Sequence, residues 1–203
     1  METMPSSEDL KNASNKQETL RRQFARLRKA THETMRAEEQ QRLKDNPLPT
    51  EDELYMGAFR EWLEPQMRDA IPIMYRKGYA TESSGFHATR PQQQLADGYF
   101  EIDPQTKAVL NSMGVEVLRG PDIGLPNNKH ITILRFSGTE PSIDVLKKKW
   151  DAIAAALPPT ELPAAIRPIC DRAEEFRLQF APDYPSLEGA RKAFHDYVDA
   201  KDY

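Results

Sequence analysis

The sequence predicts an α+β fold: a small, mostly antiparallel sheet covered by helices, with an N-terminal charged helix and a C-terminal helical hairpin. Short strand-like runs come in pairs separated by one helical segment, which is typical of antiparallel sheets; a doubly wound parallel sheet would have longer and more apolar strands. A charged segment without glycine or proline precedes these runs, and two amphipathic segments follow them. Both flanking regions are therefore expected to be helical.

The N-terminal part divides into a tail and an arm. Residues 1–15 are polar and are expected to be a disordered tail. Residues 16–44 are expected to form a charged helical arm, with nine Lys/Arg against four Asp/Glu. Its apolar stripe (Leu20, Phe24 and Leu27) is thin, so the helix needs a partner or must lie against the body.

The core domain is expected to span residues 50–157. It begins with a capping box, Thr50 to Glu53, ahead of a long apolar-faced helix that ends at Gly78. Prolines 65 and 72 are expected to kink or split this helix. Four strands are expected at 79–81, 98–103, 115–118 and 131–136.

Two more helices complete this domain. Asp103 is the expected N-cap of a helix at 105–113, and Ser142 that of a helix at 143–157. A further extension, residues 164–203, is expected to form a helical hairpin on its two apolar stripes. The side chains expected to meet in the interior of the core domain are Trp62, Met67, Ile71, Ile133, Phe136, Leu146 and Trp150.

Composition limits the class of protein. The net charge of −4 does not by itself favour a polyanion or a membrane partner. The single cysteine, Cys170, excludes an intrachain disulfide. No apolar run is long enough to cross a bilayer and the N-terminus lacks an apolar core, so we expect a soluble, cytoplasmic protein. No motif predicts a cofactor or a metal site.

The segment 81–87 is the leading candidate site, because small and hydroxyl residues beside a histidine are able to hold a phosphate or share a proton. A structural turn in which the serines bond the backbone is the alternative. The ligand-binding candidates in this segment are Thr81, Glu82, Ser83, Ser84 and His87. The catalytic candidates are Ser83, Ser84, His87 and His130, the last of which also flanks a predicted strand.

The second candidate is the basic stretch of the charged arm. Five cations there are interleaved with apolar residues, a pattern that suits RNA, an acidic protein surface or a membrane interface. A solvated helix face is the alternative. The candidate contact residues for nucleic acid or a partner are Arg21, Arg22, Arg26, Arg28 and Lys29.

Three functions remain open. We favour a protein-interaction or accessory subunit, bound to another protein or to itself, because the helical stripes exceed what a small core can bury. A small-ligand-binding protein or enzyme with a site around residues 81–87 is the first alternative. A nucleic-acid-binding accessory protein that uses residues 20–29 is the second.

Overall fold

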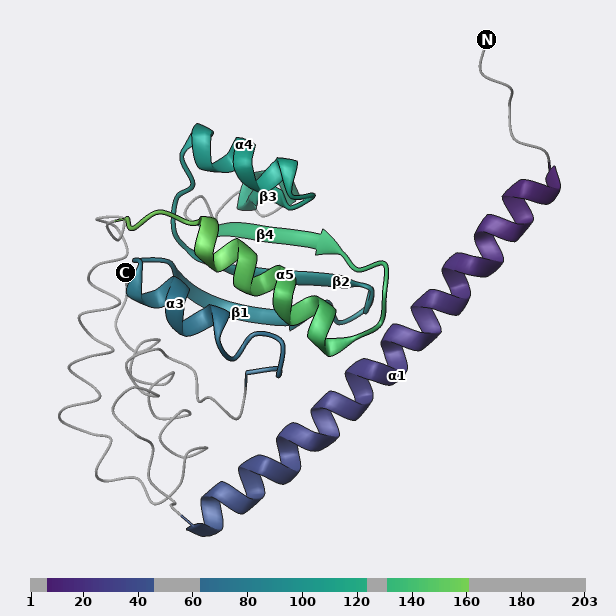
Figure 1. The fold of residues 1–203 in the computed structure, drawn as a ribbon, viewed down its shortest axis with the longest axis horizontal. Helices are drawn as coiled ribbons and strands as arrows, with labels where there is room; N and C mark the ends of the chain where they lie inside the picture. Colours follow the sequence, from purple (N-terminus) through teal and green to yellow (C-terminus); the bar gives the residue numbers. More distant parts are fainter. Residues whose placement is uncertain (1–6, 46–62, 124–130, 161–203) are drawn as a thin grey trace.

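The structure, a computed structural model, describes residues 7–45, 63–123 and 131–160. It confirms the α+β fold (Figure 1). The described elements, in chain order, are α1 (Ser7–Asp45), α3 (Ala70–Arg76), β1 (Ala80–Phe86), β2 (Gln93–Tyr99), α4 (Pro104–Ser112), β3 (Glu116–Arg119), the 3₁₀ turn η2 (Gly120–Ile123), β4 (Ile131–Ser137) and α5 (Ile143–Ala156).

The four strands form one antiparallel sheet in the order β1-β2-β4-β3. After β2 the chain crosses through α4 to the far edge, which leaves a gap that β4 fills. Strand β4 is therefore central, and its β-branched and aromatic sequence suits a strand that is paired on both sides. Strand β1 is an edge strand.

Helices α3 and α5 pack side by side on one face of the sheet, and α4 lies against α5 and β3 (Figure 1). Trp150 and Ile153 of α5 are fully buried, and the Trp150 ring lies 5.1 Å from that of Phe136. Of the seven residues expected in the interior, Met67, Ile71, Phe136, Leu146 and Trp150 belong to this core. Ile133 is also buried, but it alternates with core residue Leu134 and so lies on the opposite sheet face.

The first two strands differ from the prediction. Strand β1 runs from Ala80 to Phe86 and so takes in most of the segment expected to be a loop. Strand β2 is Gln93–Tyr99 rather than 98–103. Both errors have one cause: hydroxyl, glycine and glutamine residues dominate these strands, and tertiary pairing overrides their low strand propensity.

The later elements follow the prediction closely. Asp103 caps α4, because its carboxylate accepts hydrogen bonds from the backbone N–H groups of Gln105 and Thr106 at 2.9 Å. Strand β3 begins and ends one residue later than predicted, and α5 begins at the predicted residue and ends one residue earlier. Ser142 occupies the N-cap position of α5, although its side chain makes no cap hydrogen bond.

Helix α1 is longer than expected. It begins at Ser7, so residues 7–15, expected to be disordered, are helical; extending an established helix costs far less than nucleating a new one. Its 39 residues span about 58 Å at 1.5 Å per residue. Only part of that length touches the body, and the N-terminal third projects away from it (Figure 1).

The contacts of α1 with the body begin at its apolar stripe. Phe24 is fully buried, and Leu20 and Leu27 pack beside it against the same core. A Cβ on Gly138, which follows β4, would stand only 2.6 Å from the Phe24 ring, so the ring needs a residue without a side chain here. The predicted stripe is thus the surface by which the helix docks.

Polar contacts extend this attachment toward the C-terminal end of α1. Arg28 Nη1 donates a hydrogen bond of 2.7 Å to the Ala88 carbonyl. Arg68, just before α3, forms an ion pair with Glu38. This ion pair holds the pKa of Glu38 below its usual range, chiefly through the hydrogen bond from Arg68. The anchored part of α1 therefore extends from about Leu20 to Glu38.

Several predictions fall outside the described ranges: the Thr50–Glu53 capping box, Trp62, the 164–203 hairpin and Cys170. The boundaries proposed for separate domains stay predictions. No helix within the described ranges is both long and apolar enough to cross a membrane.

Candidate binding site between α1 and the β1–β2 turn

The segment expected to form a site is mostly strand. Ser83 pairs with Asp97 and Ser84 pairs with Ala96, so the two serines point to opposite faces of the sheet. Ser83 is exposed and Ser84 is half-buried. Thr81 precedes a bulge in β1, and its carbonyl accepts a hydrogen bond from the Tyr75 hydroxyl. The strand thus separates the two hydroxyls that were expected to act together.

Two of the other candidate residues, His130 and Glu82, are not described or are described only in part. His130 falls between the described ranges, and the side chain of Glu82 is not described. Within the described ranges, no three His, Cys, Asp or Glu side chains gather in a way that would hold a metal ion.

His87 follows β1 and organises the turn into β2. Its Nδ1 accepts hydrogen bonds from the backbone N–H groups of Thr89 and Arg90, each at 3.2 Å. Burial lowers the pKa of His87, and the nearby charges of Arg90, Arg135 and Arg28 lower it further. An unprotonated Nδ1 is required for both hydrogen bonds, so the geometry and the electrostatics favour the same neutral form.

The cations of α1 divide between two faces of the helix. On the outer face, Lys29 forms an ion pair with Glu33 at 3.7 Å; Arg22, between this face and the pocket, forms one with Glu18 at 3.0 Å. Arg26 is exposed on this face. Both ion pairs are i,i+4 pairs in solvent, so they neutralise charge and contribute little stability.

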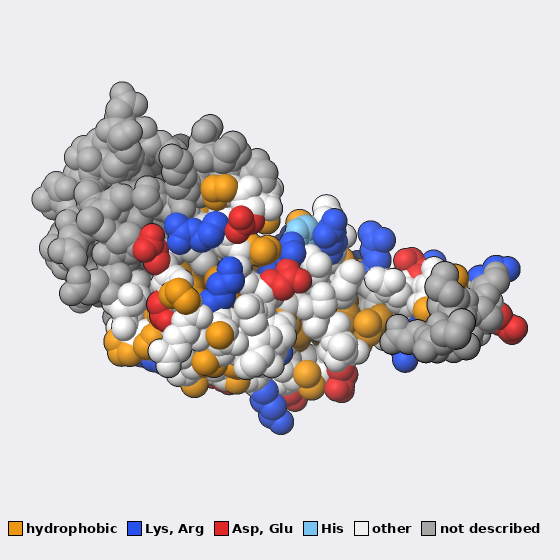
Figure 2. All heavy atoms as spheres, turned by 90° about the horizontal axis from the view of Figure 1, so that it is seen from above, with side chains coloured by type: hydrophobic (Ala, Val, Ile, Leu, Met, Phe, Trp, Pro, Cys, Tyr) orange, Lys and Arg blue, Asp and Glu red, His pale blue; other side chains and the backbone are white. Residues whose placement is uncertain are grey.

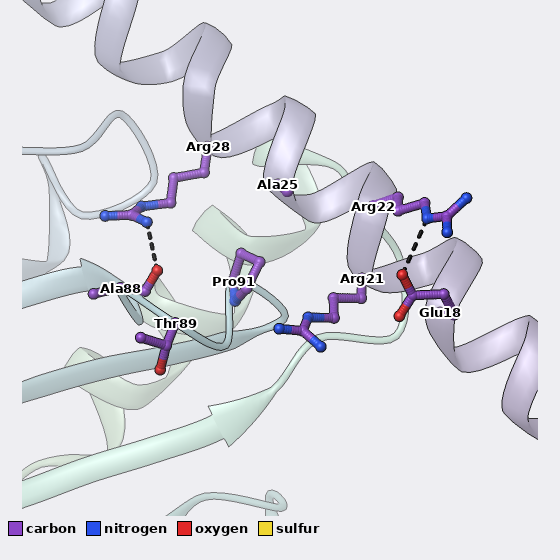
Figure 3. Close-up of a pocket in the computed structure, with 8 residues that line it drawn as sticks. All are labelled: Glu18, Arg21, Arg22, Ala25, Arg28, Ala88, Thr89 and Pro91. Atoms are coloured by element: carbon purple, nitrogen blue, oxygen red, sulfur yellow. Dashed lines mark hydrogen bonds and ion pairs between the residues drawn. The ribbon is translucent and has the colours of Figure 1, made fainter.

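Arg21 and Arg28 lie instead on the flank that faces the β1–β2 turn, where they line a pocket (Figure 3). The pocket has a volume of about 440 Å³. From α1 it is lined by Glu18, Arg21, Arg22, Ala25 and Arg28, and from the turn by Ala88, Thr89 and Pro91. The structure thereby brings the basic helix together with the turn that follows the predicted 81–87 site, although no residue of 81–87 lines the pocket.

The pocket is basic. Its three arginines and one glutamate have formal charges that sum to +2, and Arg90 adjoins it in the turn. In Figure 2, basic side chains gather beside a histidine where the body meets the projecting helix. Arg135 contributes less, because Glu116 accepts a hydrogen bond of 2.9 Å from its Nε.

Two arginine groups in the pocket lack partners. The Arg21 side chain points from α1 toward Pro91 and makes no hydrogen bond or ion pair with a described residue (Figure 3). The Nε of Arg28 is buried and likewise has no hydrogen-bond partner in the described ranges. A guanidinium has five N–H donors, so both side chains retain capacity to bind an anion.

A second pocket, of about 410 Å³, lies near Tyr79 and the start of α4. Its carboxylates are already used, since Asp103 caps α4 and Glu101 faces Arg119 at 3.6 Å. The hydroxyl of Tyr79 donates to the Pro158 carbonyl. This second pocket therefore offers less free polar capacity than the first.

Beneath α1 lies a buried polar network that the sequence did not reveal. The carboxylate of Glu64 accepts hydrogen bonds of 2.7 Å from Gln66 Nε2 and from the Phe86 backbone N–H, and His32 Nε2 lies 2.7 Å from its other oxygen. Gln66 also donates to Gln94 Oε1 at 3.0 Å. The network thus joins α1 and β1 to β2, and no motif spacing marks its members in the sequence.

The fold and the site together define an α+β protein with a long docked helix and a basic pocket at its junction with the sheet. Comparison with models of known protein families, with curated proteins and with solved structures gives no match.

Proposed function

We propose that the protein is an accessory subunit that binds another protein through the projecting part of α1. The observation that carries the proposal is the continuation of the docking stripe beyond the body. Leu10, Ala13 and Gln17 extend the spacing of Leu20 and Phe24 along the same helix face, but they are exposed. Leu10 is 59% exposed, the most of any large hydrophobic residue in the described ranges.

Physical chemistry supports a partner on this stripe. Helices in proteins gain most of their stability from packing of one apolar face, and within the described ranges the residues before Leu20 have no such packing. We further propose that the protein binds its partner in the cytoplasm, because a chain with a single cysteine forms no intrachain disulfide and needs no oxidising compartment.

Nucleic acid is the weaker alternative for α1. Arg22 and Lys29 of α1 already have acidic partners, so fewer charges are left for phosphate contacts. The large hydrophobic residues that are exposed within the described ranges include no aromatic ring for stacking on bases; they are Leu10, Val109, Ile123 and Val145.

The test is affinity capture from an extract of the protein's own cells, with the tagged full chain. Leu10→Asp and Ala13→Asp place a charge on the stripe, and Asn12→Asp is the matched control on another face of the same helix turn. We expect a stoichiometric partner that binds wild type and Asn12→Asp but neither stripe variant, and that binds again when purified. Equal capture by all four chains, or no capture, contradicts the proposal.

Light scattering on the purified chain separates the two kinds of partner. If the partner is a second copy, the mass doubles with concentration and the doubling is lost in Leu10→Asp. If it is a different protein, the purified chain stays monomeric and the captured protein restores a complex.

A further inference from the structure

We propose that the pocket between α1 and the β1–β2 turn binds a phosphate monoester dianion. The inference goes beyond the proposed function, because it concerns a small anion and needs no protein partner. It depends on the junction geometry, which places cations from α1 around a turn that exposes a hydroxyl group.

Both Arg21 and Arg28 have N–H donors available for a ligand. Arg21 has no partner among the described residues, and its guanidinium lies across the pocket from Thr89 (Figure 3). Arg28 uses Nη1 for the Ala88 carbonyl, which fixes its position and leaves other N–H groups. Two arginines held at one pocket present the planar, forked donors that suit phosphate oxygens.

The formal charge of the pocket suits a dianionic ligand. Arg22 and Glu18 neutralise each other at the rim, so the excess charge of the lining is the +2 of Arg21 and Arg28. A phosphate monoester carries nearly two negative charges above its second pKa of about 6. A carboxylate or a phosphodiester, with one charge, would leave a cation uncompensated.

The volume and the apolar wall of the pocket suit a phosphate ester. A volume of about 440 Å³ is within the usual range for small-molecule sites, and too large for a bare ion. The apolar wall made by Ala25, Ala88 and Pro91 would contact the organic part of an ester. The backbone of Thr89 is held by His87 Nδ1, so its side chain is presented from an ordered turn.

The test is isothermal titration calorimetry on the full chain, at a pH above the second phosphate pKa. The probes are phenyl phosphate, inorganic phosphate and a short single-stranded oligonucleotide. We expect phenyl phosphate to bind best, inorganic phosphate next, and Arg21→Gln to weaken both by about tenfold, the factor for one charge-assisted hydrogen bond. Arg36→Gln removes an exposed α1 cation that does not line the pocket, and should leave binding unchanged.

Three results overturn the inference: no binding up to millimolar concentrations, an equal effect of Arg36→Gln and Arg21→Gln, or binding of the oligonucleotide alone. The last result points to nucleic acid instead. Because the titration uses the chain without a partner, it is independent of the capture experiment. Capture that survives Arg21→Gln, together with failed titration, would leave the proposed function intact.

Discussion

The Glu64 carboxylate occupies the space in which a Gly85 side chain would lie. A Cβ built on Gly85 overlaps Glu64 Oε2, and the backbone of Gly85 has φ = +117°, a conformation that favours glycine. This close approach allows Oε2 to accept the N–H of Phe86 at the outer edge of β1. Glycine at position 85 is therefore a condition for the buried network under α1.

Gly85→Ala is expected to lower the free energy of unfolding by about 3 kcal/mol, because it adds both backbone strain and a collision with Glu64. Gly114→Ala is the matched control, since Gly114 also has positive φ (+72°) but faces only the flexible end of Lys149 at 3.8 Å. It should cost about 1 kcal/mol. Urea unfolding measures both, and equal losses would show that Glu64 plays no part in the effect.

Glu64→Ala is expected to cost about 3 kcal/mol or more, since it leaves the buried Phe86 N–H and one of the two Gln66 Nε2 hydrogens without an acceptor. Glu64→Gln should cost less, because an amide oxygen replaces Oε2 and the amide nitrogen faces His32, which is able to accept in its other tautomer. Glu38→Gln, at a partly exposed ion pair, should cost about 1 kcal/mol or less. Urea unfolding ranks the three variants by their loss of unfolding free energy. An equal loss in Glu64→Ala and Glu38→Gln would contradict a stabilising role of the network.

Stability should depend on pH through His87. The folded pKa of His87 is lowered by burial and by the arginines around it, so the folded chain favours the neutral ring. The contribution is present above the unfolded pKa of about 6.5 and is lost as the pH falls through the lower folded value. Nuclear magnetic resonance titration should give a His87 pKa below 6.5, and a value at or above it would contradict this prediction.

His87→Asn supplies the control for the pH experiment. Its side-chain oxygen replaces Nδ1 as the acceptor for the Thr89 and Arg90 N–H groups but does not titrate. We expect the turn to persist and the His87 contribution to the pH dependence of unfolding to vanish, while the contribution of acidic groups such as Glu38 remains.

Apolar periodicity and capping residues made much of this fold predictable. Asp103 and the stripe of Leu146, Trp150 and Ile153 are local signals, readable without knowing what lies opposite. Strand β1 was not readable in this way, because its serines and Gly85 become strand only through pairing with β2. Long-range pairing is the part of the fold that a single sequence conceals.

The sequence singled out individual residues at or beside the pocket, but it did not show that they lie close together. Arg21, Arg28 and His87 all stood among the candidates, yet they belonged to separate hypotheses. The docking of Phe24 over Gly138 and the hydrogen bond from Arg28 to Ala88 bring the basic helix to the β1–β2 turn. The thin apolar stripe does not predict which surface the helix docks on. Glu64 was missed because a lone glutamate before a proline carries no sign of burial.

The most direct measurement of the central claim is hydrogen–deuterium exchange along α1 in the full chain. If Phe24 docks the helix and leaves its N-terminal part free for a partner, residues 20–35 exchange slowly and residues 7–19 exchange fast. Phe24→Ala should abolish the protection of residues 20–35 and spare that of β4, while Leu10→Ala changes neither. Equal exchange rates along the whole of α1, or protection that survives Phe24→Ala, would contradict the account.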